Sequence, residues 1–376
     1  KVEADRMTKL TPDKPRFVAG SIGPTGKAAS MSPDVENPAL RDIDYDTLQN
    51  AFITQIRALI KGGVDLLLME TIFDTLNTKA AIAAAEKVFM EIGKRIPIML
   101  SVTVSDAAGR TLSGQTMEAF LSSVSHADLL SVGLNCSFGA EQMTPFLRQI
   151  SDSSPYYVSA YPNAGLPDAM GEYDETPEMM AKGIERFVTE GLVNIVGGCC
   201  GSTPAHIRAI AKIIEKHPGV RRELHESRIP WLSGLEGFHS NGAFINVGER
   251  CNVAGSRKFL RLIKEKSYDE ALSIARKQVR DGAMVLDVNM DDGMLDAKTE
   301  MVNFVNLMAS DPEIARVPWM VDSSRFEVIE AALKCIQGKA IVNSISLKEG
   351  EEKFLNKARR VKELGAAVVV MAFDEI

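Results

Sequence analysis

Short apolar runs alternate with amphipathic helical patterns along almost the whole chain. This alternation is typical of βαβ units, in which consecutive strands lie parallel in one sheet. Most predicted strands end in small or polar residues, and a TIM-type barrel gathers such strand ends at one mouth. The sequence therefore predicts an α/β fold of the TIM type. The predicted strands are Phe17–Ile22, Asp65–Glu70, Ile98–Val104, Leu129–Asn135, Tyr157–Tyr161, Val193–Val196, Phe244–Gly248, Met284–Val288, Trp319–Asp322, Ile341–Ile345 and Ala367–Phe373.

The chain of 376 residues is longer than one hydrophobic core normally serves, so we expect two domains. Residues 217–241 combine proline, glycine and mixed charge without strand alternation, which is typical of a linker. We therefore expect two (β/α)8 barrels in tandem, at 1–216 and 242–376. Neither half has enough strands for a closed barrel, so we expect the first to lack its first βα units and the second its last.

Composition narrows the possible functions. The net charge of −7 and the dispersed lysines and arginines indicate no nucleic-acid partner. No apolar run approaches the roughly 18 residues of a membrane span, and the polar start does not resemble a signal peptide. Five cysteines, two of them adjacent, indicate a reducing, cytoplasmic location in which thiols serve metal binding or catalysis.

The adjacent cysteines Cys199 and Cys200 follow a predicted strand within the segment Gly197–Gly201, and Cys136 also follows a strand. We expect these three thiolates to meet at one barrel mouth. Zinc is the metal that this set favours, because it prefers soft sulfur ligands in tetrahedral geometry. Three protein ligands leave the fourth position for water or substrate, as in catalytic zinc sites, and a thiol bound there loses its proton near neutral pH.

Other interpretations of these thiols remain. Free cysteine is among the most buried residue types, so a core position for Cys136 is also consistent with the sequence. The Cys199–Cys200 pair is also consistent with a redox-active vicinal disulfide, although adjacent cysteines cannot form an unstrained one. Cys251 and Cys335 match no metal pattern.

The second half also has polar residues where predicted strands end. These residues are Asp287, Asn289, Asp322 and Asn343. Carboxylate and amide groups can pair with the edge of a nitrogen heterocycle. Gly255, Ser256 and Arg257 open a predicted helix, whose free backbone donors suit an anion or a polar ring. Asp and Asn are also common helix-capping residues, and the Asp291–Asp292 pair is also consistent with a cation such as magnesium.

The thiol motifs resemble those of the homocysteine methyltransferase domain. The segments Met69–Thr75, Leu112–Thr116 and Tyr161–Pro167 are similar to the version in the cobalamin-dependent methionine synthase family. The resemblance implies that Cys136, Cys199 and Cys200 hold a zinc ion that activates homocysteine.

It further implies that Glu70 receives the amino group of homocysteine, and that Asn135 and Asn163 line the same mouth. The Asp-Gly-Gly-Met-Gly-Thr-like motif of the family's first strand is absent, so we expect an incomplete substrate site.

The strand ends of the second half resemble the pterin-binding domain shared by dihydropteroate synthases and corrinoid methyltransferases, specifically the folate domain of the same synthase family. The resemblance implies that Gly255, Ser256, Arg257, Asp322 and Asn343 contact 5-methyltetrahydrofolate. It places Asp287 and Asn289 along the pocket. Further pterin contacts in the family fall on later strands, beyond Ile376.

Together the resemblances imply an enzyme that makes methionine from homocysteine, with the methyl group of 5-methyltetrahydrofolate carried by cobalamin. The chain has no Asp-x-His-x-x-Gly loop for a cobalt ligand. We therefore expect cobalamin-binding and reactivation modules elsewhere in the same polypeptide, and we assign no catalytic residue. The alternatives are a cobalamin-independent homocysteine S-methyltransferase, a zinc enzyme for another thiol, and a folate-binding module with structural zinc.

Overall fold

The computed structural model describes residues 1–376 except 220–221, 225, 241, 243 and 373–376. The described residues contain two parallel sheets, and in both sheets the strands lie in sequence order. The first sheet consists of β1 (Ala19–Ile22), β2 (Leu66–Ile72), β3 (Ile98–Val102), β4 (Ser131–Asn135), β5 (Tyr157–Tyr161) and β6 (Ile195–Val196). The second consists of β9 (Val247–Asn252), β10 (Val285–Asn289), β11 (Trp319–Asp322), β12 (Ile341–Ser346) and β13 (Ala367–Met371). The predicted α/β class with parallel strands is confirmed. Among the described residues, no pairing joins the first and last strand of either sheet.

Helices connect the strands, as parallel neighbours require. In the first half, α1 (Val2–Leu10) precedes β1, and the helices that follow are α2 (Tyr45–Lys61), α3 (Thr75–Ile92), α4 (Met117–Val124), α5 (Ala140–Ser153), α6 (Pro177–Thr189) and α7 (Pro204–Lys216). In the second half they are α8 (Arg257–Lys264), α9 (Tyr268–Arg280), α10 (Ala297–Ala309), α11 (Pro312–Ala315), α12 (Phe326–Leu333), the short 3₁₀ helix η1 (Leu347–Glu349) and α13 (Glu351–Glu363).

Helix α3 shows how local sequence sets these boundaries. The Asp74 side chain accepts hydrogen bonds from the backbone N–H groups of Leu76 and Asn77, which satisfies donors that the first turn leaves free. Gly93 ends the helix in the left-handed conformation that glycine adopts at low cost. Strands β3 and β4 are buried at every position, as is typical of the strands of parallel sheets in α/β proteins.

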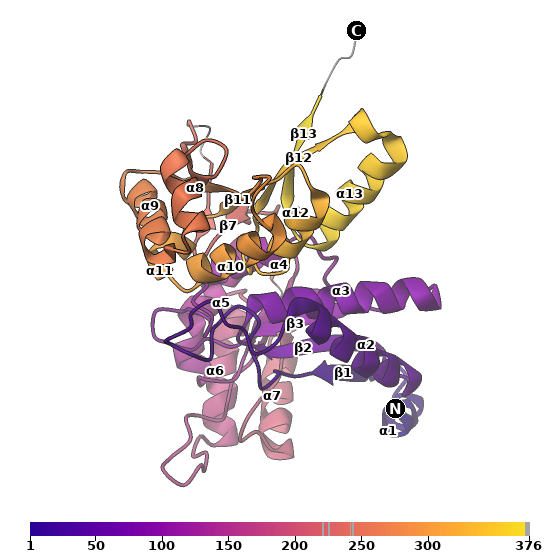
Figure 1. Cartoon of the computed structure of the whole chain (residues 1–376). Coiled ribbons are helices and arrows are strands. Elements are labelled where there is room, and N and C mark those ends of the chain that lie inside the picture. Colours follow the sequence, from indigo (N-terminus) through magenta and orange to yellow (C-terminus); the bar gives the residue numbers. More distant parts are fainter. Residues whose placement is uncertain (220–221, 225, 241, 243, 373–376) are drawn as a thin grey trace.

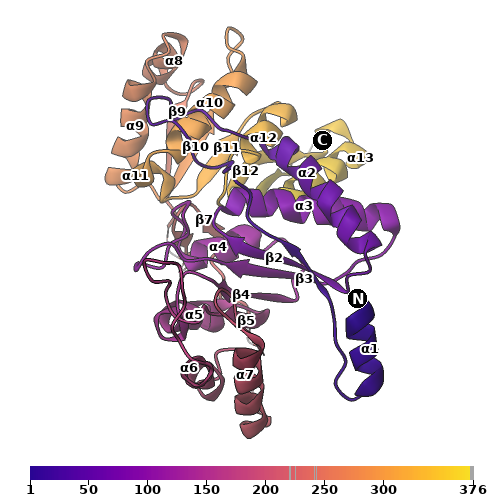
Figure 2. The same cartoon turned by 90° about the horizontal axis from the view of Figure 1, so that it is seen from below.

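The two halves pack directly against each other. Figure 1 shows the first half, in indigo to magenta, below the second, in orange to yellow, and Figure 2 shows α3 between the first sheet and the second half. The buried Lys79 of α3 donates hydrogen bonds from Nζ to the carbonyls of Ile336, at 3.2 Å, and Gly338, at 2.9 Å. Arg41 donates to the Asn306 carbonyl at 2.9 Å.

Two features differ from the sequence prediction. The predicted linker contains a hairpin of β7 (Leu232–Ser233) and β8 (Gly237–Phe238), which packs between the halves: Leu235 N–H donates to Ala315 O at 2.8 Å, and its carbonyl accepts from Thr116 N–H at 3.0 Å. Strand β9 runs to Asn252, beyond the predicted end at Gly248. The prediction ended the strand too early because Glu249 and Arg250, which are exposed, interrupt the apolar pattern. The predicted strand end at Phe373 lies outside the described residues.

Candidate metal and substrate sites

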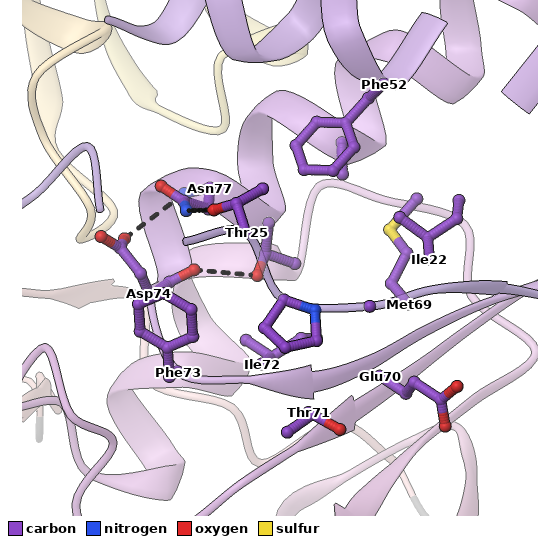
Figure 3. Close-up of a pocket in the computed structure, with 14 residues that line it drawn as sticks. Ile22, Thr25, Phe52, Met69, Glu70, Thr71, Ile72, Phe73, Asp74 and Asn77 are labelled. Carbon is purple, nitrogen blue, oxygen red and sulfur yellow. Dashed lines mark hydrogen bonds between the residues drawn. The ribbon is translucent and has the colours of Figure 1, made fainter. Parts of the chain in front are cut away.

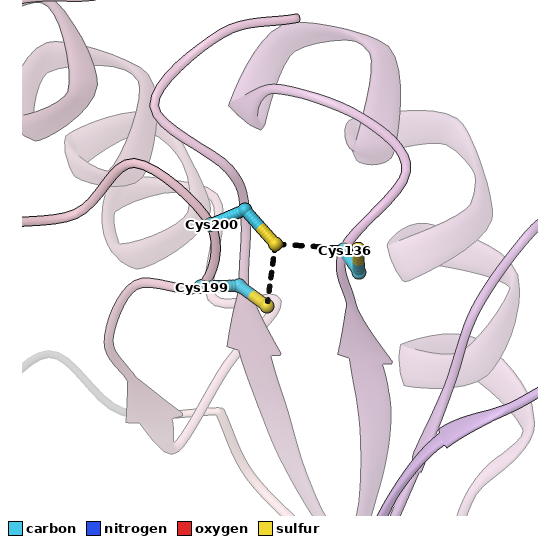
Figure 4. Close-up of side chains that lie close together, drawn as sticks. All are labelled: Cys136, Cys199 and Cys200. Atoms are coloured by element: carbon cyan, nitrogen blue, oxygen red, sulfur yellow. Dashed lines mark hydrogen bonds between the residues drawn. The ribbon is translucent and has the colours of Figure 1, made fainter. Parts of the chain in front are cut away.

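Three cysteine sulfurs lie together where loops leave the carboxyl ends of β4 and β6 (Figure 4). The Sγ of Cys200 is 3.8 Å from that of Cys136 and 3.9 Å from that of Cys199. All three sulfurs lie within 4.8 Å of one another. Sulfurs that share a tetrahedral zinc ion at about 2.3 Å are about 3.8 Å apart, so both the spacing and the soft donors fit zinc.

The backbone beside this cluster adopts conformations that are rare for residues other than glycine. Cys136 and Ser137 have φ angles of 64° and 61°, and Thr71 on β2 has φ of 57°. Each such residue costs on the order of 1–3 kcal/mol and persists only where its surroundings hold it. Here Cys136 N–H donates to the Tyr161 carbonyl at 3.2 Å, and Ser137 Oγ hydrogen-bonds Thr103 Oγ1 at 2.7 Å. The turn directs Cys136 toward the loop after β6.

Two glycines make the loop after β6 possible. A Cβ on Gly198 would lie 2.2 Å from Ser202 Oγ, so a side chain there would displace the loop. Gly201 has φ of 75°, and a Cβ on it would lie 2.5 Å from Tyr173. These close approaches explain why glycine flanks the adjacent thiols.

The thiols shift one another's pKa values. Interaction with Cys199 lowers the pKa of Cys136 to about 5, and the same interaction raises the pKa of Cys199. Asn163, which is 2% exposed, also lies against the cluster: its Oδ1 accepts from Cys200 N–H at 3.1 Å. One sulfur of the group is therefore readily deprotonated, which is the form that binds a metal ion.

Glu70 lies near the carboxyl end of β2, where its carboxylate accepts a hydrogen bond from Ser21 Oγ. In Figure 3, Glu70 and Thr71 lie on the opposite side of the β2 ribbon from Phe52. The crevice on the Phe52 side has a volume of about 30 Å³, which is room for a water molecule or two. That crevice, which Glu70 and Thr71 also line, is too small for an amino acid, and the Glu70 side chain is half-buried.

Asn135 closes β4 and is 1% exposed. Its side chain contacts Thr71, Ser101 and Cys199, which joins the ends of β2, β3 and β4 to the thiol loop. Sequence reasoning missed Thr71 and Ser101. The polar end of β2 was a signal for Thr71, whereas Ser101 lies inside an apolar run and had none.

Tyr173 is a further residue that sequence reasoning missed. It forms a β-bridge with Pro167, and its interaction with the Cys200 side chain raises the pKa of Tyr173. It belongs to the loop after β5, beyond the motif that drew attention to Asn163. The mouth of the first sheet thus contains an aromatic hydroxyl beside the thiols.

In the second sheet, four polar residues lie side by side across four neighbouring strands. Asn289 pairs in register with Asn252 on one side and Asp322 on the other, and Asp322 pairs with Asn343. Asn252 was missed by sequence reasoning, because the predicted strand ended before it. The four residues thus form a row across the sheet, at the carboxyl ends of β9, β10 and β11 and within β12. Asp287 lies two residues before Asn289, on the same face of β10.

Hydrogen bonds join this row into one network. Asn252 Nδ2 donates to Asp287 Oδ2 at 3.2 Å and to Asp322 Oδ2 at 3.3 Å, and Asn289 Nδ2 donates to the same Asp322 oxygen at 2.9 Å. Burial, reinforced by the Asp322 charge, raises the pKa of Asp287 to about 7, and burial also raises that of Asp322. The pair can therefore offer both a carboxylate and a protonated carboxyl near neutral pH.

The predicted segment Gly255–Arg257 lies directly beyond this row. Gly255 N–H donates to Asn252 Oδ1 at 3.1 Å, which anchors the loop to β9. Ser256 caps α8, since its Oγ accepts from Phe259 N–H at 3.3 Å, and Arg257 is exposed in the first turn. The segment thus adds a helix start and a cation to the same edge.

Comparison with known families agrees with this arrangement. The chain belongs to the homocysteine S-methyltransferase family, which matches residues 1–214. The pterin binding enzyme family matches residues 248–376. In this order, the two matches fit the homocysteine and folate domains of a methionine synthase. The family membership indicates a methyltransferase that acts on homocysteine.

Solved structures that match part of this chain include the homocysteine methyltransferase MmuM from Escherichia coli. Its apo form is 20% identical, with a TM-score of 0.41, over 56% of this chain and 67% of that chain. Its metallated form is 24% identical, with a TM-score of 0.40, over 55% of this chain and 65% of that chain. This chain thus spans about two thirds of the MmuM chain.

No helix in the described part of the chain is long and apolar enough to cross a bilayer.

Proposed function

We propose that this chain performs the two substrate-handling parts of methionine synthesis: activation of homocysteine in the first half and binding of 5-methyltetrahydrofolate in the second. The observation that carries the proposal is the cluster of three cysteine sulfurs, with the spacing of a tetrahedral zinc site, at the strand ends that also contain Glu70.

In the first half, Cys136, Cys199 and Cys200 would hold zinc, which keeps a bound homocysteine sulfur deprotonated and nucleophilic. Glu70 would accept the amino group of homocysteine, and its bond from Ser21 Oγ fixes the carboxylate. In the transfer, the homocysteine sulfur forms a bond to the methyl carbon while the donor keeps the electron pair of the broken bond.

In the second half, Asp322 and Asn343 would contact the pterin, with Asp287 and Asn289 along the pocket and the start of α8 beside it. This assignment is supported by the row that Asn289, Asp322 and Asn343 form across neighbouring strands. It is also supported by the raised pKa of Asp287, which lets the two carboxyl groups offer both a hydrogen-bond donor and an acceptor. A protonated carboxyl would place a proton near the ring nitrogens, which makes the tertiary amine a better leaving group.

The finer architecture belongs to the same proposal. The two sheets would be parts of (β/α)8 barrels, with domains at 1–216 and 242–376 joined by 217–241. The methyl group would pass from the second site to the first on cobalamin. One further module of the same polypeptide would bind the cobalamin, and another would reactivate it. The support is the order of the two family matches along the chain.

A proton-release titration tests the proposal. The zinc-loaded chain is titrated with homocysteine in weak buffer, with methionine as the control without a thiol. Binding to an open metal position should release about one proton per site, because the thiol binds as thiolate. Zinc that binds tightly but causes no release with homocysteine would indicate a structural metal and overturn the assignment.

A further inference from the structure

Asn135 makes four hydrogen bonds at the thiol mouth. Its Oδ1 accepts from Thr71 N–H at 2.9 Å and from Ser101 Oγ at 2.7 Å. Its Nδ2 donates to Thr71 Oγ1 at 2.9 Å and to Cys199 Sγ at 3.7 Å. An amide side chain has two donor hydrogens and two acceptor lone pairs, so every position is occupied.

This occupancy argues against direct substrate binding by Asn135. The side chain is 1% exposed, and a substrate atom could bind it only by displacing one of these partners. Displacement would leave a buried polar group unpaired, which is costly. Asn135 therefore acts through the residues it holds.

The partners of Asn135 lie on both sides of the proposed homocysteine site. Cys199 belongs to the proposed metal ligands, and Thr71 directly follows Glu70, the proposed acceptor of the amino group. Thr71 has φ of 57° beside a register shift in β2, and its backbone N–H and hydroxyl are both bonded to Asn135. One side chain thus ties the backbone next to the amine acceptor to a metal-site sulfur.

We propose that Asn135 is a positioning residue that sets the distance between the sulfur-binding and amine-binding positions, and thereby selects homocysteine over shorter aminothiols. The inference rests on the proposed function. Cysteine differs from homocysteine by one methylene, so a site of fixed length can engage the sulfur and the amine of only one of them well. One methylene in a shaped site is typically worth about 10–200-fold in discrimination.

The test compares Asn135→Ala with Ser131→Ala in the full chain. Ser131 lies at the other end of β4, and its buried hydroxyl has no hydrogen-bond partner among the described residues, so Ser131→Ala leaves the links of Asn135 to Thr71 and Cys199 in place. Each zinc-loaded protein is titrated calorimetrically with homocysteine and with cysteine. For Asn135→Ala we expect zinc to stay bound, homocysteine affinity to fall about 10-fold or more, and cysteine affinity to change less, so that selectivity narrows. Ser131→Ala should keep the ratio of homocysteine affinity to cysteine affinity that the unmodified chain has.

Asn135→Asp provides a second variant of the same shape. It keeps an acceptor for Thr71 N–H but replaces the donor to Cys199 with an oxygen. With Co²⁺ in place of zinc, we expect its sulfur-to-metal charge-transfer band to shift, a change that a purely structural role would not produce. Unfolding midpoints establish that each variant is folded.

The outcomes separate this inference from the proposed function. An unmodified chain that fails to bind homocysteine would contradict the proposed function itself. If the unmodified chain binds homocysteine, but Asn135→Ala and Asn135→Asp both keep its preference over cysteine, the positioning role is wrong. Narrowed selectivity in Asn135→Ala together with the shifted band in Asn135→Asp supports it.

Discussion

Asn289 donates a hydrogen bond from Nδ2 to Oδ2 of Asp322 at 2.9 Å, and the two residues are direct register partners at the ends of β10 and β11. This contact lies in the middle of the polar row of the second sheet. It holds the Asp322 carboxylate at the mouth, where a pterin would bind. The row provides two predictions, and the thiol cluster and the contact between the halves provide one each.

Asp322→Asn should weaken the binding of 5-methyltetrahydrofolate. The substitution keeps the size of the side chain but removes the charged acceptor, and a hydrogen bond to a charged group contributes about 1.5–3 kcal/mol, or roughly 10–150-fold in affinity. Isothermal calorimetry on the unmodified and variant chains measures the effect. Asp281→Asn, at an exposed position after α9, is the matched control and should bind normally. Equal affinities for all three proteins would remove Asp322 from the pterin site.

Asp287→Asn should change how stability depends on pH. Burial and the Asp322 charge raise the pKa of Asp287 from 3.8 to about 7. Between these values the folded chain holds a proton that the unfolded chain has lost, so the free energy of unfolding falls as pH rises through this window. The variant cannot titrate there, and it should lose less stability between about pH 4 and about pH 7, by about 3 kcal/mol.

Urea unfolding at both ends of that window measures the difference, and Asp281→Asn again serves as the control. A variant whose stability follows pH as steeply as that of the unmodified chain would show that Asp287 titrates near its ordinary value.

Serine at any position of the thiol cluster should reduce zinc affinity on the order of 100-fold or more. Cys136→Ser, Cys199→Ser and Cys200→Ser each replace a soft thiolate with a hard, protonated hydroxyl. Competition with a chromophoric chelator gives the affinities. Cys335→Ser is the control, because its sulfur lies outside the cluster and donates to the Ala331 carbonyl at 3.4 Å. Loss of zinc from the control as well would point to a different site.

Lys79→Met should alter stability in the alkaline range. Burial and the nearby Lys339 lower the pKa of Lys79 from 10.5 to about 7. Between these values the unfolded chain binds a proton that the folded chain does not. In the unmodified chain this residue therefore makes the free energy of unfolding increase as pH rises. In the variant, the increase in the free energy of unfolding over this pH range should be smaller by about 3 kcal/mol.

Chemical unfolding at about pH 7 and about pH 10 tests this, with Lys87→Met on the exposed side of α3 as the control. The carbonyls of Ile336 and Gly338 also lose their donor in Lys79→Met. The variant should therefore be less stable than the control at the higher pH. Parallel pH curves for the two variants would mean that Lys79 keeps its ordinary pKa.

Much of the fold followed from periodicity. Strands β5 and β11 have the boundaries that their residue patterns predicted, because an apolar run between turn residues is a local signal. Cys136, Asn289 and Asp322, where strands end, were recognisable for a similar reason, since polar groups at the ends of apolar strands of an α/β fold gather at one edge.

The sequence by itself determined the α/β class, the order of strands and helices, and the identity of the polar residues at the strand ends. Only the tertiary structure decided that β9 extends to Asn252, that Ser101 and Thr71 surround Asn135, and that Lys79 bonds to the second half. The physical reason is the distance along the sequence over which each kind of interaction acts. Periodicity and capping act between residues a few positions apart, whereas register and hydrogen-bond partners depend on strands that meet only after the chain has folded.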